Sequence, residues 1–173
     1  MEKFHINDLH FNPDDCKWEE VESWYDCKQF NVTEMEKQGW NSLNGCWTYS
    51  SNIPDNISDI AGKLFKKYQL SILKQPSGNS MPIHTDSYRR FRKLYDPEDK
   101  RNSKPVIRLI VFLKDWESGH YLEYNYEPIT KWKKGDAYMI KTGVTHLSGN
   151  MGNTPKYTMQ LTGFREDFNE RAL

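Results

Sequence analysis

The stretch PVIRLIVFL, residues 105–113, gives the strongest strand signal in this 173-residue sequence. It is almost continuously apolar and rich in β-branched side chains, which is typical of a strand buried on both faces of a sheet. Arg108 interrupts it, and a buried guanidinium needs a partner. The sequence therefore predicts a central strand of a β-rich core that carries one charged side chain.

Shorter segments on both sides of this stretch also have strand character. Turn-forming Lys-Gly-Asp, Thr-Gly and Asn-Met-Gly steps separate the later segments. Short strands at regular spacing, after one or two helices, are typical of a β-sandwich or barrel with helices packed outside. The segments are YQLSILKQ (68–75), GHYLEYNY (119–126), DAYMI (136–140), VTHLS (144–148) and YTMQLTGF (157–164).

The remaining segments are predicted to support this core within a single domain of residues 1–173. Residues 1–67 are expected to be a helical and irregular support region for a β core at 68–165. Within it, 57–67 has the periodicity of an amphipathic helix, whereas 19–38 is only weakly helical. PSGNSMP (76–82) is predicted to be a loop, and the charged stretch 88–104 a long loop or short helix over the barrel mouth.

Composition excludes several classes of partner. The 24 basic and 24 acidic side chains balance, so neither nucleic acid nor an acidic membrane surface is indicated. No apolar run approaches membrane-spanning length, and the start of the chain lacks the apolar core of a signal peptide. Cys16, Cys27 and Cys46 have no CxxC spacing. We therefore expect reduced thiols in a cytoplasmic protein.

The segment MPIHTDSYRRF (81–91) suggests a metal site. In a strand His84 and Asp86 point to the same side, so both could ligate one ion. His146, about 60 residues later, is the favoured third ligand, and His120 remains an alternative. Two imidazoles and a carboxylate are the ligand set of non-haem Fe(II) oxygenases and leave three coordination positions open. A structural zinc site would be closed by four ligands, usually including thiolates.

The motif His84-x-Asp86, then His146, then Lys156-x-Thr158 resembles the Fe(II)/2-oxoglutarate-dependent dioxygenase superfamily. RLIVFLKDWESGHYLEY (108–124) and WKKGDAYMI (132–140) resemble strands of its prolyl-hydroxylase-like members, and several segments resemble small oxygenases encoded by marine bacteriophages. The resemblance covers residues 68–163. It implies a mainly β fold with flanking helices, a double-stranded β-helix of the jelly-roll or cupin-like kind.

The resemblance also implies roles for individual residues. His84, Asp86 and His146 would bind Fe(II), and Lys156, assisted by Thr158, would bind the distal carboxylate of the cosubstrate 2-oxoglutarate. Where many members have a tyrosine that contacts the oxoacid, this sequence has Lys74. That contact is therefore either missing, or expected from Lys74 as a second cation or from Tyr68 or Ser71 of the same strand.

Three further residues have two interpretations each. Arg108 is either in a structural ion pair with an acid such as Glu123 or Asp136, or in contact with an oxoacid or substrate carboxylate. Arg89 is either on a solvated face or in contact with an anionic substrate. Asn150 is either a turn residue or a cosubstrate contact.

The activity implied is hydroxylation of a C–H bond with O2, forming succinate and CO2. Asp86 favours hydroxylation, since related halogenases have a small residue in its place. The primary substrate, a small molecule or a protein side chain, is not indicated by the sequence. Two alternatives remain: a cupin-like metal dioxygenase that does not use 2-oxoglutarate, and a non-enzymatic jelly-roll binding module.

Overall fold

The computed structural model describes residues 1–19, 32–37, 39–41, 44, 48–98 and 103–173. Most of the weak helix expected over 19–38 lies outside these residues, and its end forms the short helix α1 (Val32–Lys37). Cys27 and Cys46 also lie outside the described residues, while Cys16 is a free thiol.

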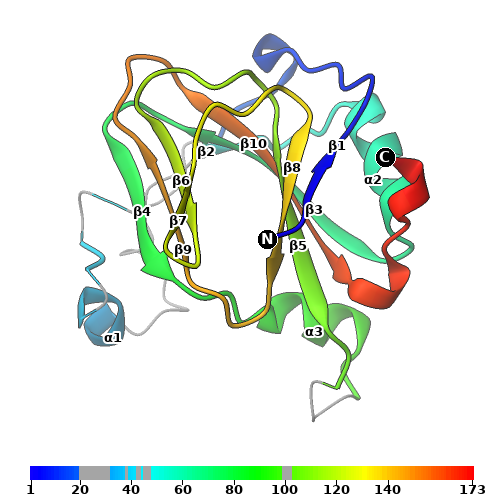
Figure 1. Ribbon diagram of the computed structural model, residues 1–173. Coiled ribbons are helices and arrows are strands. Elements are labelled where there is room, and N and C mark those ends of the chain that lie inside the picture. The colour runs from blue at the N-terminus through cyan, green and yellow to red at the C-terminus, as the bar shows by residue number, and fades with distance from the viewer. Residues whose placement is uncertain (20–31, 38, 42–43, 45–47, 99–102) are drawn as a thin grey trace.

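Two antiparallel sheets face each other, the smaller on the left and the larger on the right of Figure 1. The larger sheet has the order β1-β8-β5-β10-β3-β2, and the smaller β4-β9-β6-β7. From β3 onward the chain changes sheet at each connection, the β6–β7 hairpin excepted. This interleaving is a double-stranded β-helix, which confirms the predicted fold class. The strands are β1 (Lys3–His5), β2 (Thr48–Tyr49), β3 (Tyr68–Gln75), β4 (Asn79–His84), β5 (Val106–Phe112), β6 (His120–Tyr124), β7 (Glu127–Ile129), β8 (Asp136–Lys141), β9 (His146–Asn150) and β10 (Lys156–Phe164).

The structure corrects the sequence interpretation at two places. The predicted loop 76–82 is mostly strand, because the turn after β3 ends at Gly78, whose φ of 77° favours glycine, and β4 begins at the next residue. The amino-terminal region also contributes strands, since β1 and β2 extend the larger sheet at its two edges.

Helices flank the larger sheet. Helix α2 (Asp55–Leu64) covers its outer face in Figure 1, and Leu64 ends it slightly earlier than predicted. Helix α3 (Arg89–Tyr95) is the short helix expected within 88–104, and its Phe91 packs against the ends of β5 and β10. Short 3-10 turns complete the chain at Pro13–Asp15, Arg165–Asp167 and Glu170–Ala172. Among the described residues, no helix is long and apolar enough to cross a membrane.

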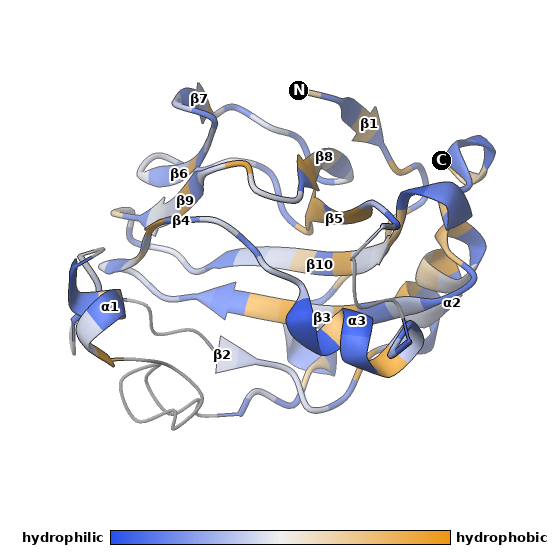
Figure 2. Ribbon diagram, turned by 90° about the horizontal axis from the view of Figure 1, so that it is seen from below, coloured by the Kyte–Doolittle hydropathy of each residue, from blue (hydrophilic) through white to orange (hydrophobic). Residues whose placement is uncertain are grey.

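The larger sheet separates two cores, and β10 shows how. Its Met159 and Leu161 belong to the outer core beneath α2. Thr158 and Gln160 lie opposite Phe112 and Ile110, which belong to the inner core between the sheets. Because side chains alternate along a strand, the even-numbered residues of β10 therefore face the barrel interior. Figure 2 shows the hydrophobic residues concentrated in β5, β8 and α2, whereas the smaller sheet is more polar.

Candidate metal centre

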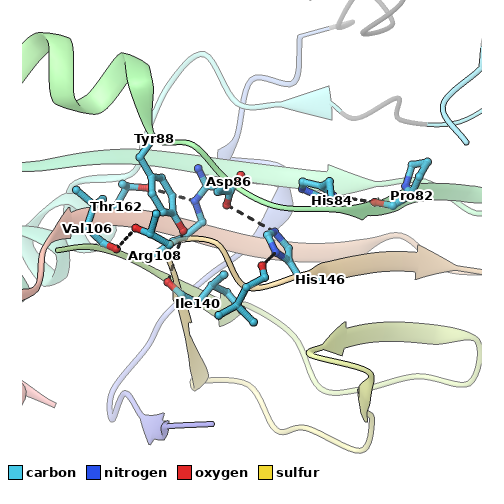
Figure 3. A network of polar contacts seen from close by, with 11 residues as sticks. Pro82, His84, Asp86, Tyr88, Val106, Arg108, Ile140, His146 and Thr162 are labelled. Atoms are coloured by element: carbon cyan, nitrogen blue, oxygen red, sulfur yellow. Dashed lines mark hydrogen bonds and ion pairs between the residues drawn. The ribbon is translucent and has the colours of Figure 1, made fainter. Parts of the chain in front are cut away.

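The fold brings His84, Asp86 and His146 together at one end of the smaller sheet. His84 ends β4 and lies opposite His146, which begins β9, and Asp86 follows two residues later. One ligand atom from each residue lies within 4.8 Å of the others. The two rings are 4.3 Å apart at their centroids, and Asp86 Oδ2 is 3.5 Å from His146 Nε2 (Figure 3).

His120 does not belong to this cluster. It lies opposite Asn150, four residues further along β9 than His146. Its ring is buried and stacks on Trp132, with Nε2 3.0 Å from the carbonyl oxygen of Thr154. Of the two candidates for third ligand, the geometry therefore selects His146.

Hydrogen bonds prepare both histidines as metal ligands. His84 Nδ1 lies 2.7 Å from the carbonyl oxygen of Pro82, and His146 Nδ1 lies 3.1 Å from that of Val144. A carbonyl only accepts, so each Nδ1 carries the proton and each Nε2 presents its lone pair. Burial, and then the neighbouring His84, lower the pKa of His146 to about 4, which keeps it neutral. This donor set fits a divalent transition metal such as Fe(II).

Asp86 also contacts Arg108, and Figure 3 shows its carboxylate between Arg108 and His146. Arg108 Nη1 is 2.7 Å from Asp86 Oδ2, and its Nε donates to Thr162 Oγ1 at 3.1 Å. The predicted partners were wrong: Glu123 accepts instead from the Tyr121 hydroxyl, and Asp136 pairs with Lys3. Arg108 therefore restricts the orientation of the carboxylate in the site.

Two aromatic residues at the site were missed. The ring of Tyr88 lies 5.1 Å from the Arg108 guanidinium, and its φ of 52° is in the left-handed region. Burial raises the pKa of Tyr88, so its hydroxyl stays protonated. Trp40 packs edge-on against His84, with ring centroids 5.5 Å apart. Tyr88 follows Asp86 by two residues, and this spacing could have predicted that it lies near the site. Trp40 belongs to no motif.

Lys156 lies inside the barrel, and one of its partners, Ser148, is two residues from His146. Lys156 is 4% exposed, and its Nζ donates to the carbonyl of Tyr121 (2.7 Å), Ser148 Oγ (2.6 Å) and the carbonyl of Gly149 (3.0 Å). Ser148 is two residues after His146, hence on the same face of β9. Burial lowers the pKa of Lys156 to about 7. Within the described part of the chain no carboxylate pairs with this amine.

The other residues predicted to contact the cosubstrate lie on different faces of the larger sheet. Thr158 shares the inner face of β10 with Lys156, but Lys74 and Tyr68 were placed wrongly. Lys74 lies opposite Tyr157 and stacks on Trp18, and Tyr68 packs against the outer core. The alternation of β3 instead turns Ser71, opposite Gln160, toward the interior.

Asn150 and Arg89 are not in contact with the three metal ligands. Asn150 is the last residue of β9 and is 0% exposed, so the interpretation as a turn residue was wrong. Its side-chain amide donates to the carbonyls of Gln75 and Thr154 and accepts from the N–H of Gly152, so it holds the turn that follows β9. Arg89 is exposed at the first residue of α3, so its contact with an anionic substrate stays a prediction.

Comparisons with known proteins found similar solved structures. No protein-family model and no curated protein matches the chain. The cupin domain of Schizosaccharomyces pombe Cnp3 aligns with a TM-score of 0.43 and 12% identity over 69% of this chain and 66% of that one, just under two thirds of its length. A predicted oxalate decarboxylase from Thermotoga maritima aligns at 0.43 and 14% over 68% and 80%. KdgF from Halomonas sp. aligns at 0.41 and 11% over 70% and 80%. The fold of this chain is assigned from its own strand order and not from these alignments.

Proposed function

We propose that this protein is a non-haem Fe(II)- and 2-oxoglutarate-dependent oxygenase that hydroxylates a C–H bond. The observation that carries the proposal is the convergence of two imidazoles, from the end of β4 and the start of β9, with the carboxylate of Asp86, which follows β4. Such a set holds an ion on one side and leaves positions for a bidentate cosubstrate and O2. The buried amine of Lys156, which has no carboxylate partner among the described residues, supports 2-oxoglutarate as that cosubstrate.

Each side chain has a definite task in this proposal. His84, Asp86 and His146 would hold the iron, and Arg108 would restrict the orientation of the Asp86 carboxylate. Lys156 and Thr158 would bind the distal carboxylate by charge and hydrogen bonds. The apolar inner core would keep water away from the site. When bound, Fe(II) supplies the oxidation chemistry, in which O2 and 2-oxoglutarate yield succinate, CO2 and the hydroxylated substrate.

One observation favours a second candidate, a cupin-like metal enzyme that does not use 2-oxoglutarate. All three N–H groups of Lys156 already donate to neutral acceptors of the protein. In that case Lys156 would join the two sheets and no oxoacid would bind beside it.

A succinate-release assay separates the two candidates. The Fe(II)-loaded protein is given 2-oxoglutarate and O2 with panels of small molecules and peptides. We expect succinate formation that depends on both iron and 2-oxoglutarate and that a correct substrate accelerates. The proposal is wrong if the iron-loaded protein neither binds 2-oxoglutarate nor releases succinate with any panel member, while it does bind iron.

A further inference from the structure

A hollow lies between α3, the start of β5, the turn after β8 and the end of β10. It has a volume of about 420 Å³ and none of the three candidate ligands lines it. Its lining combines three cations with an apolar wall, made by Arg92, Lys141 and Arg165 and by Pro105, Val106 and Ile107. That volume lies within the range of small-molecule sites.

The cations of this hollow are incompletely neutralised. Glu2 alone serves two of them, at 2.9 Å from Lys141 Nζ and 3.6 Å from Arg165 Nη2. Arg92 forms no ion pair within the described part of the chain, and its Nη1 is buried without a hydrogen-bond partner. The acids nearby, Asp96 and Glu166, both lie within reach of Lys104 instead.

A buried donor without a partner is costly, and in a native protein it often marks the place of a missing acceptor. An anion that enters the hollow would provide the acceptor that the guanidinium of Arg92 lacks. A phosphate group offers close to two charges and three acceptor oxygens, which suits a hollow lined by three cations better than the two oxygens and single charge of a carboxylate. The apolar wall would take the carbon skeleton of the same molecule.

We propose that this hollow is a second ligand site, and that it binds a small phosphate monoester. Arg92 from α3 and Lys141 from the end of β8 contact the phosphate, and Val106 and Ile107 contact the organic part. The site is independent of the proposed oxygenase activity, since no residue of the metal centre belongs to it.

Titration of the metal-free full chain tests the proposal, with amide chemical shifts in NMR as the readout. The probes are inorganic phosphate and phenyl phosphate at constant ionic strength, with succinate as a dicarboxylate comparison. We expect saturable shifts at Val106, Ile107 and Thr142, with phenyl phosphate binding more tightly than phosphate and succinate more weakly. Arg92→Gln should weaken phenyl phosphate binding by about tenfold or more, the loss expected for one charge-assisted contact.

Lys93→Gln is the matched control, because Lys93 is exposed on the same helix and does not line the hollow. It should leave the affinity almost unchanged. If Arg92→Gln does not fold, as judged by circular dichroism, Lys141→Gln at the end of β8 carries the same expectation. Absence of saturation in the wild type, shifts that saturate elsewhere, or equal weakening by Lys93→Gln would each overturn the proposal.

Discussion

The candidate metal centre is organised by short-range contacts of individual residues. Each histidine is oriented by the carbonyl two residues before it, and Asp86 is oriented by Arg108. These partners fix the tautomer and direction of the ligand atoms before any ion arrives, which lowers the cost of forming the site. Arg108 also brings a positive charge into contact with Asp86, so the expected metal affinity of the candidate site combines the gain from positioning with electrostatic repulsion.

Alanine substitutions of His146 and His120 should show which of the two is the third metal ligand. We expect His146→Ala to weaken Fe(II) binding by more than the roughly 10–100-fold typical of losing an outer-shell partner. His120→Ala should leave Fe(II) affinity within a few-fold of wild type, because His120 contacts Thr154 instead. Anaerobic isothermal titration calorimetry gives both affinities. The reverse ranking would contradict the site described here.

Substitution of the buried lysine should affect the cosubstrate and spare the metal. Lys156→Ala should weaken 2-oxoglutarate binding by tenfold or more, about the value of one charge-assisted contact, while Fe(II) affinity stays near that of wild type. Both constants are measured on the same preparation by anaerobic titration. Equal loss of both would mean that Lys156 supports the barrel rather than the cosubstrate.

The low pKa of Lys156, about 7, predicts a pH effect on cosubstrate binding. Above that pH the amine of the free protein loses its proton, so 2-oxoglutarate should bind progressively more weakly as the pH rises from 7 to 9. Lys156→Arg keeps its charge throughout this range, so its dissociation constant should change less with pH. If the dissociation constants of wild type and Lys156→Arg change with pH in parallel, deprotonation of Lys156 is not the cause of the pH effect.

At the scale of elements, the packing of α2 on β10 keeps the larger sheet rigid behind the site. An ideal Cβ at Gly163 would lie 2.2 Å from Phe65 Cδ1, and Phe65 is fully buried. The absence of a side chain at this position of β10 therefore allows the residue after α2 to pack directly against the strand.

Gly163→Ala should destabilise the protein by about 1–3 kcal/mol, the usual cost of overpacking a core. Gly62→Ala is the matched control: it lies within α2, and an added Cβ would be 3.8 Å from the Tyr68 hydroxyl, an ordinary contact. That change should stabilise the protein by about 0.5–1 kcal/mol. Urea unfolding of both variants measures the free energies. A neutral Gly163→Ala would show that the helix can shift away from β10.

The sequence predicted those elements whose pattern is local. The apolar run of β5, the alternation of β10 and the His84-x-Asp86 spacing depend only on neighbours along the chain. Lys74 and Tyr68 were misplaced because the inner face of β3 depends on its register with β10. The partner of Arg108 was missed for a similar reason, since Asp86 reaches it only after β4 and β5 enter opposite sheets.

At the scale of the whole molecule, the interleaved topology brings the residues of the candidate metal centre together. Strands β4 and β9 are separated by about 60 residues in sequence yet are neighbours in the smaller sheet, and their register places the two histidines opposite each other. Lys156 then comes from the next strand, in the facing sheet, and crosses the interior to β6 and β9. A fold of this kind provides the ligands from one sheet and the cation from the other.

The most direct test of the central claim is the anaerobic absorption spectrum after Fe(II) and 2-oxoglutarate are added to the protein. We predict a visible charge-transfer band in wild type and in Thr85→Ala, whose side chain is exposed between the two ligands. Asp86→Ala should lose the band and bind iron weakly. A wild-type protein that takes up iron without the band, or an Asp86→Ala variant that keeps it, would contradict the account.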